Sequence, residues 1–288
     1  MKRFLSMYWF FFLPLILVIL IFAGFWFLRS RLQDDSIPVG LDFPGNRVMF
    51  VFPHPDDEIT CAGTLKALNR QGKETILITL TRGEAGTTNG LVDESDPVRK
   101  KRELGQLRSR ELESVSELLD IDRLEIFDFP DSGIKDIPAE VLKSVIEEKI
   151  DRYQPSVIIT YDDKIGLYGH PDHVAIARYV KEIFESNKGR NNFPVQRLYQ
   201  ITLPRPMIET AMQISDYFKQ NYPTLTENGL PSPTLAVKIT EFGAYKRDAM
   251  LLHRSQRSTF DDMQPYFDRF PPSLYFRIFD KEYFARVE

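Results

Sequence analysis

A cluster of histidine and carboxylate residues follows a short apolar run. Val48-Met49-Phe50-Val51-Phe52 reads as a buried strand, and Pro53-His54-Pro55-Asp56-Asp57-Glu58 comes directly after it. In open α/β sheets, ligands bind in the crevice beyond the carboxyl ends of the strands. Because Asp56 and Asp57 are adjacent, they cannot easily face the same way. One carboxylate could therefore hold a metal ion while the other handles a proton.

A second cluster, His170-Pro171-Asp172-His173, follows the apolar run 156–161. Pro171 fits the first position of a helix, where its missing N–H costs nothing. His170 and His173 are three residues apart, so they would lie on one helix face. Two histidines and one carboxylate with open coordination positions suit catalytic Zn²⁺. The same ligand set could hold non-haem iron.

Alternating strands and helices would position the two clusters. Apolar runs predict strands at 47–52, 75–81, 123–129, 156–161, 197–203 and, less clearly, 236–240. Helices are expected near 58–71, 98–119, 138–152, 170–186, 206–220 and 241–254, with a Pro-rich connection before the short strand. This alternation predicts an α/β protein with a three-layer Rossmann-like fold and a mostly parallel sheet. The polar strand ends at 53–58, 82–86, 130–133 and 162–173 should then converge on one edge.

Composition limits the partners and the chemistry. The 288 residues suit one large domain plus an appendage. The net charge is −4, the pI is about 5.7, and no basic stripe is joined to aromatic residues, so a nucleic-acid partner is not expected. Cys61 is the only cysteine, which excludes an internal disulfide and a thiolate metal cluster. The oligomeric state cannot be read from this sequence.

The N-terminal region predicts a membrane anchor. Residues 7–28 contain no charge and would span roughly 33 Å as a helix, against about 30 Å for a bilayer core. A cleaved signal peptide would have a shorter apolar region, and Ala23-Gly24-Phe25 is a poor cleavage site. We therefore expect a single-pass membrane protein. Flanking charges balance, so the membrane side of the catalytic domain is undetermined.

The expected domain organisation follows from these features. Residues 1–6 are a short flank, 7–28 the transmembrane anchor, 29–45 a polar linker, 46–257 the catalytic domain and 258–288 an aromatic-rich extension that packs on it. A fragment from about residue 40 is expected to fold alone. The aromatic side chains of the extension could form a final strand and cover the core, or some could form an exposed apolar surface at a membrane.

The two His motifs together resemble the PIG-L/LmbE family of zinc-dependent de-N-acetylases. The resemblance covers roughly residues 46–257 and is supported by further segments in the family's order. These are Thr81-Arg82-Gly83-Glu84-Ala85-Gly86, Leu107-Arg108 with Glu111, Pro130-Asp131-Ser132-Gly133 and His253-Arg254-Ser255-Gln256. The family includes the enzyme that deacetylates N-acetylglucosaminyl-phosphatidylinositol. The resemblance therefore implies removal of an acetyl group from an N-acetylglucosamine conjugate, with the membrane anchor favouring a lipid-linked one.

The family pattern also implies roles for single residues. His54, Asp57 and His173 would be the Zn²⁺ ligands, and Asp56 would be the general base that takes the proton of the metal-bound water. His170 would stabilise the oxyanion or protonate the leaving amine. Asp172 would orient a histidine from outside the metal shell. The residues that resemble substrate-contacting positions are Glu84, Arg108, Asp131 and Tyr168. His253 is expected to pack or cap near the site.

Two other functions remain open on the sequence alone. The first is a catalytically silent family member that binds glycans, although the core polar positions are intact. The second is a 2-His-1-carboxylate iron oxygenase, a class usually found on jelly-roll folds. Metal analysis would separate the second from a deacetylase, and acetate release would separate the first.

Overall fold

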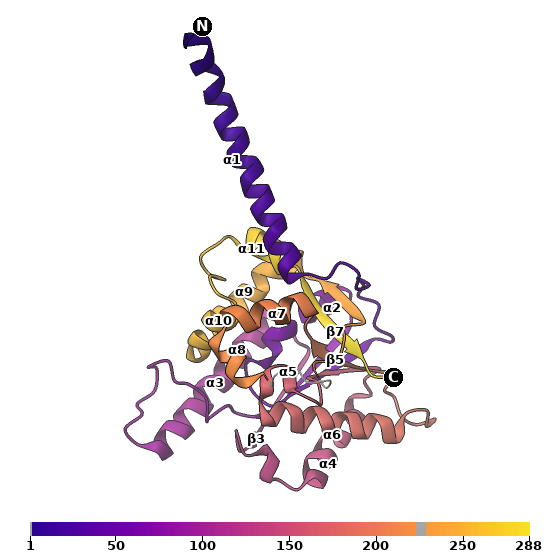
Figure 1. The fold of residues 1–288 in the computed structure, drawn as a ribbon. Coiled ribbons are helices and arrows are strands. Elements are labelled where there is room, and N and C mark those ends of the chain that lie inside the picture. The colour runs from indigo at the N-terminus through magenta and orange to yellow at the C-terminus, as the bar shows by residue number, and fades with distance from the viewer. Residues whose placement is uncertain (1, 223–228) are drawn as a thin grey trace.

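The computed structural model describes residues 2–222 and 229–288, with side chains from Phe12 onward except those at 217 and 221. Met1 of the predicted flank and part of the Pro-rich connection lie outside the described residues. A long helix, α1 (Lys2–Leu32), projects from an α/β domain (Figure 1). Its Phe12–Leu32 segment is long and apolar enough to cross a membrane, and none of its most apolar stretch is buried by the domain.

The sheet explains why the two His clusters meet. Its seven described strands are β1 (Arg47–Phe52), β2 (Glu74–Thr81), β3 (Arg123–Phe129), β4 (Val157–Thr160), β5 (Arg197–Thr202), β6 (Leu235–Lys238) and β7 (Lys281–Arg286). Their order is β3-β2-β1-β4-β5-β7-β6. β1 to β5 are parallel, and β7 is antiparallel to both of its neighbours. The chain order reverses between β1 and β4, which is where such sheets bind ligands.

Two apolar layers sandwich the sheet, as β1 illustrates. Val48, Phe50 and Phe52 are buried in one core, while Met49 and Val51 are buried in the other. This alternation follows the two-residue period of a strand. The first layer contains α2 (Ala62–Arg70), α3 (Pro97–Leu119) and α9 (Gly243–Leu252); the second contains α4 (Ala139–Tyr153) and α6 (Pro171–Asn187). The predicted α/β fold with a mostly parallel sheet is therefore confirmed.

Several predicted helices are divided in the structure. The helix expected at 58–71 begins as a 3₁₀ turn, η1 (Asp57–Cys61), before α2. The helix expected near 206–220 is two helices, α7 (Arg205–Ile214) and α8 (Asp216–Asn221). Ser215 separates them because its hydroxyl accepts a hydrogen bond from the Phe218 N–H at 3.1 Å and caps α8. The loop after β4 contains the short helix α5 (Gly166–Gly169).

Further short helices complete the described chain. They are the 3₁₀ turns η2 (Ile134–Asp136), η3 (Thr240–Phe242) and η4 (Arg254–Gln256), and the helices α10 (Arg257–Met263) and α11 (Pro272–Ile278). The last two belong to the aromatic extension. That extension ends in β7, which lies between β5 and β6, and its Phe267, Phe276 and Phe284 are fully buried.

The segment that follows α1 packs on the domain over much of its length. Leu32, Ile37 and Phe43 are buried. The Gly40 N–H donates to the Ala236 carbonyl at 2.9 Å, and the Ala236 N–H donates to the Pro38 carbonyl at 2.8 Å. Residues 38–40 therefore pair with the outer edge of β6, and α1 joins the domain through a packed connection.

Candidate metal centre and active site

The three predicted metal ligands converge at the switch point of the sheet. His54 follows β1, Asp57 opens η1, and His173 lies in the first turn of α6. The His54 Nδ1 and His173 Nε2 atoms are 3.3 Å apart. Asp57 Oδ1 is 3.1 Å from His173 Nε2, and Asp57 Oδ2 is 3.5 Å from His54 Nδ1. Tetrahedral ligands on an ion with bonds of about 2.1 Å would be separated by roughly 3.4 Å, so these distances fit one ion.

Each histidine presents a lone pair to this point because its other ring nitrogen is engaged elsewhere. His54 Nε2 lies 3.1 Å from Asp131 Oδ1 and 3.3 Å from Asp172 Oδ2. His173 Nδ1 lies 3.1 Å from the Gly166 carbonyl oxygen. Both contacts require an N–H, which leaves His54 Nδ1 and His173 Nε2 without a hydrogen. Metal-binding histidines commonly use carboxylates and backbone carbonyls in this way.

The donor set therefore fits a cation. Two lone pairs and a carboxylate face one another, and in the neutral tautomers neither nitrogen can donate to the other. Among the described residues, the trios whose ligand atoms all lie within 4.8 Å of one another are His54 with His170 and His173, and His54 with Asp131 and Asp172. We favour His54, Asp57 and His173 because the surrounding hydrogen bonds orient their free atoms toward one point.

Asp56 is held in an unusual backbone conformation next to the ligand Asp57. Its φ of 110° lies in the region that non-glycine residues rarely adopt. The Asp56 N–H donates to Glu58 Oε2 at 3.0 Å, and Asp56 Oδ1 pairs with Arg108 Nη2 at 2.9 Å. Burial raises the pKa of Asp56 to about 6, against the opposing charge of Arg108. A carboxylate with this pKa is suited to accept a proton near neutral pH.

Arg108 is buried and pairs with the Asp56 carboxylate. Its guanidinium donates to the carbonyl oxygens of Gly83, at 2.8 Å, and Pro55, in addition to the Asp56 carboxylate. Gly83 has φ of +69°, and a Cβ there would lie 2.4 Å from the guanidinium carbon, so only glycine leaves room for this arrangement. These contacts favour a role for Arg108 in holding Asp56 over the substrate contact that the sequence predicts.

A buried polar layer beneath Asp56 was not predicted. His253 Nε2 lies 2.5 Å from Glu58 Oε1, and both side chains are fully buried. Glu111 accepts hydrogen bonds from the backbone N–H and the hydroxyl of Ser255 at 2.9 and 2.6 Å. The HRSQ segment thus connects to Glu58, which in turn holds the Asp56 backbone. His253 packs near the site, as the sequence indicates.

The rings of His170 and Tyr168 lie close to the two ligand histidines. The His170 ring centroid is 4.7 Å from that of His54 and 4.8 Å from that of His173. Burial, together with these two rings, lowers the pKa of His170 to about 4, so its imidazole is neutral. His170 Nδ1 accepts the Asp172 N–H at 3.3 Å, which leaves the hydrogen on Nε2. The Tyr168 hydroxyl is 3.5 Å from His173 Nε2.

Asp131 and Glu84 accept hydrogen bonds from the backbone of the two loops beside His54. Asp131 Oδ2 accepts the Ala85 N–H at 2.8 Å, while Glu84 Oε1 accepts the Asp131 N–H at 2.9 Å. Burial would raise the pKa of Asp131, but His54 outweighs it and lowers the pKa below its usual value. Asp172 Oδ2 accepts the Ser132 N–H at 2.8 Å, and Asp172 Oδ1 is buried without a hydrogen-bond partner. Asp131 thus orients His54 from the turn after β3, a role that the family resemblance gives to Asp172 alone.

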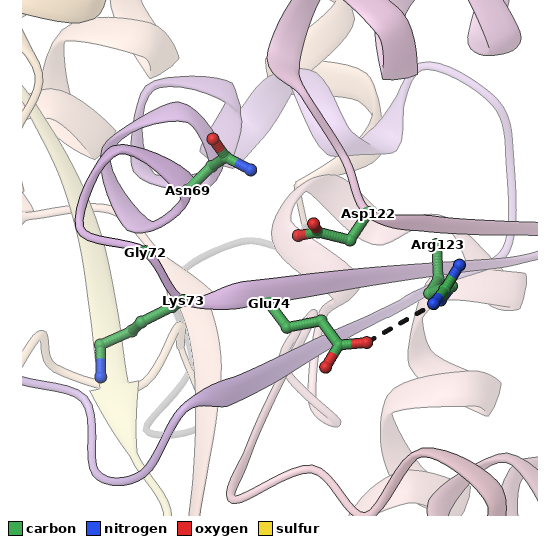
Figure 2. A pocket seen from close by; sticks show the side chains of 6 residues that line it. All are labelled: Asn69, Gly72, Lys73, Glu74, Asp122 and Arg123. Carbon is green, nitrogen blue, oxygen red and sulfur yellow. Dashed lines mark ion pairs between the residues drawn. The ribbon is translucent and has the colours of Figure 1, made fainter.

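A hollow elsewhere on the domain has no such chemistry. It lies at the amino ends of β2 and β3, the edge opposite the His cluster, and is lined by Asn69, Gly72, Lys73, Glu74, Asp122 and Arg123 (Figure 2). Glu74 and Arg123 form an ion pair across it at 3.8 Å. A second hollow beside it shares Gly72 and Glu74. Neither contains a histidine or a cluster of carboxylates that could hold a metal.

Known proteins resemble this chain in sequence and fold. The family profile described as PIG-L, GlcNAc-PI de-N-acetylase, matches residues 49–184. A 1D-myo-inositol 2-acetamido-2-deoxy-alpha-D-glucopyranoside deacetylase of Frankia casuarinae is 29% identical over 257 residues, covering 74% of this chain and 80% of that protein. The N,N'-diacetylchitobiose deacetylase of Pyrococcus horikoshii superposes with a TM-score of 0.60 at 21% identity, covering 85% of this chain and 84% of its own.

The fold is shared with another reaction class. The 4-carboxy-2-hydroxymuconate hydratase of Pseudomonas putida superposes with a TM-score of 0.60 at 15% identity, covering 85% of this chain and 97% of its own. Similarity at this level shows the fold alone. The reaction class must therefore be argued from the sequence match and the site.

A Rossmann-like sheet with a cluster of His and Asp residues at its switch point is an arrangement that could hold a catalytic metal ion. The profile match and the relatives confirm the more specific resemblance: residues 49–184 match the PIG-L profile of de-N-acetylases, and the chain is a hydrolytic N-deacetylase.

Proposed function

We propose that the protein is a zinc-dependent enzyme that removes the acetyl group from an N-acetylglucosamine conjugate. The observation that carries the proposal is the convergence of His54 Nδ1, His173 Nε2 and the Asp57 carboxylate, with the opposite ring nitrogens engaged by Asp131, Asp172 and Gly166. Two histidines and one carboxylate with an open position suit catalytic Zn²⁺. When bound, the ion would lower the pKa of a water molecule and polarise the amide carbonyl.

The chain's own residues would supply the remaining steps. Asp56 takes the proton from the attacking water, because its carboxylate sits beside the ligands with a pKa tuned upward by burial. The water oxygen bonds to the acetyl carbonyl carbon, the C–N bond breaks, and the proton passes to the departing nitrogen. The products are acetate and a free amine on the sugar.

His170 would stabilise the negative charge on the carbonyl oxygen. Its neutral ring keeps a hydrogen on Nε2, since Nδ1 accepts the Asp172 N–H. A fixed donor of this kind is what an oxyanion needs. Of the two roles implied for His170, this protonation state favours oxyanion stabilisation over protonation of the leaving amine. Tyr168, close to His173 Nε2, is a second group on the same side of the site.

The deacetylase proposal is tested by metal content and acetate release. The purified full-length protein in detergent should contain close to one zinc and release acetate from N-acetylglucosaminides. Stoichiometric iron in place of zinc would favour the oxygenase alternative. Zinc without acetate release from any conjugate would favour a glycan-binding member, or a reaction such as hydration, which the shared fold also hosts.

The membrane helix bears on the substrate. The Frankia relative is named for an inositol-linked N-acetylglucosamine. We propose a conjugate that carries a lipid, because α1 would hold the catalytic domain beside a bilayer. Paired substrates with the same sugar, one lipid-linked and one soluble, should show a higher kcat/KM for the lipid-linked form in vesicles. Equal values would overturn the lipid preference and leave the deacetylase proposal intact.

A further inference from the structure

Large apolar side chains are exposed around the point where α1 leaves the domain. We call these residues the collar. Their exposed fractions lie between 39% and 67%, and the members are Ile214, Met263, Tyr266, Phe270 and Leu274. A contiguous exposed apolar surface on a folded domain usually marks an interaction site. The collar belongs to α7, α10, α11 and the loop before α11, none of which contributes a predicted ligand or catalytic residue.

Hydrogen bonds join α7 and α11 to the end of α1, and an ion pair joins α1 to Asp280 after α11. Arg29 Nη1 pairs with Asp280 Oδ2 at 2.8 Å, and Gln33 Nε2 donates to the Ile278 carbonyl at 2.6 Å. On the α7 side, the Thr210 hydroxyl donates to the Arg31 carbonyl at 2.8 Å. Figure 1 shows α11 and the loop before it beside the domain end of α1. Two elements that carry collar residues, α7 and α11, are therefore bonded directly to the domain end of α1.

The chain separates inward-facing from outward-facing apolar residues in this region. Phe267 and Phe276 are fully buried, whereas their near neighbours Tyr266 and Leu274 are exposed. Tyr266 has φ of 66°, a left-handed conformation that residues with a side chain rarely adopt. This strained turn places Phe267 in the core while the Tyr266 ring stays outside. The exposed Tyr266 ring is therefore separate from the packed core.

The surroundings of the collar suit a lipid headgroup region. Arg269 is largely exposed, and Arg277 is exposed one turn after Leu274. The acidic Asp268 is paired with Arg257 at 2.5 Å. Exposed Asp261 and Asp262 count against an anionic surface, although Asp261 pairs with Arg257. Aromatic rings with polar tips and cationic side chains are enriched where proteins meet the membrane interface.

We propose that the collar rests in the interfacial layer of the bilayer that α1 spans. The most apolar stretch of α1 is unburied, and the last turn of the helix bonds to α7 and to Asp280, which follows α11. The domain would then have two membrane contacts, the spanning helix α1 and the collar. Together they fix the tilt of the domain, which a helix alone would leave free.

The experiment uses the full-length protein in nanodiscs that hold one copy each. The natural tryptophans Trp9 and Trp26 both lie in α1, so Trp9→Phe with Trp26→Phe gives a dark background. Phe270→Trp then places one reporter in the collar. Val98→Trp is the matched control, because Val98 is highly exposed in the first turn of α3, far from α1 in Figure 1. Discs contain either ordinary or brominated phospholipid, and circular dichroism checks that both variants are folded.

The proposal predicts that brominated lipid quenches the Phe270→Trp reporter severalfold more than the Val98→Trp reporter. Equal quenching of the two reporters would overturn it. Failure of brominated lipid to quench the natural tryptophans would also overturn it, because α1 would then not lie in the bilayer. A blue shift of the Phe270→Trp emission only when two copies share a disc would assign the collar to a second copy of the chain. Paired Phe270→Ser and Leu274→Ser changes should loosen the domain's tilt without altering bound metal.

Discussion

The ring of His173 lies flat on the ring of Tyr161, with 4.1 Å between centroids and 2° between planes. The Tyr161 hydroxyl also donates to Asp57 Oδ1 at 3.0 Å. One residue at the end of β4 therefore orients two of the three proposed metal ligands, one by stacking and one by a hydrogen bond. Burial raises the pKa of Tyr161 well above its ordinary value, so the hydroxyl keeps its proton and remains a donor.

Tyr161→Phe should weaken metal binding while keeping the fold. The ring still stacks on His173, but Asp57 loses a donor, and outer-shell partners of this kind are typically worth 10- to 100-fold in metal affinity. A chelator competition assay would measure the change. Tyr199→Phe, on β5 and packed against Phe43, is the matched control and should leave the affinity unchanged. An unaltered affinity in Tyr161→Phe would show that stacking alone positions the ligands.

Substitutions of the adjacent residues Asp56 and Asp57 should give two different phenotypes. Asp56→Asn removes the proposed base and should lower kcat by about 10²- to 10⁴-fold with zinc still bound. Asp57→Asn removes a ligand and should lose the metal together with activity, as should His173→Ala. Metal content and acetate release measured on the same preparations distinguish the outcomes. If Asp56→Asn lost the metal and Asp57→Asn kept it, Asp56 would be the ligand and Asp57 the base.

Arg108→Gln should move the acid limb of the kcat/KM profile to higher pH. Burial raises the pKa of Asp56 to about 6, and the Arg108 charge opposes that rise, so removing the charge raises the pKa further. Asp56 is then protonated, and unable to act as base, over a wider acidic range. Arg110→Gln, an exposed neighbour on α3, is the control. A uniform loss at every pH, without displacement of the limb, would mean that Arg108 acts through geometry alone.

The residues between α1 and β1 should contribute to stability. A fragment from residue 40 lacks Ile37 and Leu32, which are buried, and leaves Ala236 without the Pro38 carbonyl and Asp280 without Arg29. The two apolar side chains alone should cost about 3 kcal/mol. Fragments 29–288 and 40–288 can be compared by urea unfolding. Equal midpoints and slopes would show that this segment only connects the helix to the domain.

The sequence predicts the fold and the meeting of the two His clusters for a common physical reason. Strand alternation is a local signal, and parallel strands bring their carboxyl ends to one edge, so His54 after β1 meets His173, which lies in the first turn of the helix reached from the end of β4. Arg108 and Tyr161 are different. On α3, which carries many charges, Arg108 reads as a solvated residue, and Tyr161 reads as the last apolar residue of a strand. Their carboxylate partners, Asp56 and Asp57, are more than fifty residues away in the chain, and local periodicity contains no information on such contacts.

The position of β7 imposes an order of events on biosynthesis. β6 pairs with β7 and with residues near Val39, while β5 has β7 as its outer neighbour. Until Lys281–Arg286 leaves the ribosome, one edge of β5 stays open although all the active-site residues have already been made. An open edge strand invites pairing with other chains. A premature stop that removes only the last eight residues should therefore yield an aggregating protein with every catalytic group intact, and a chaperone that shields strand edges would be needed late in synthesis.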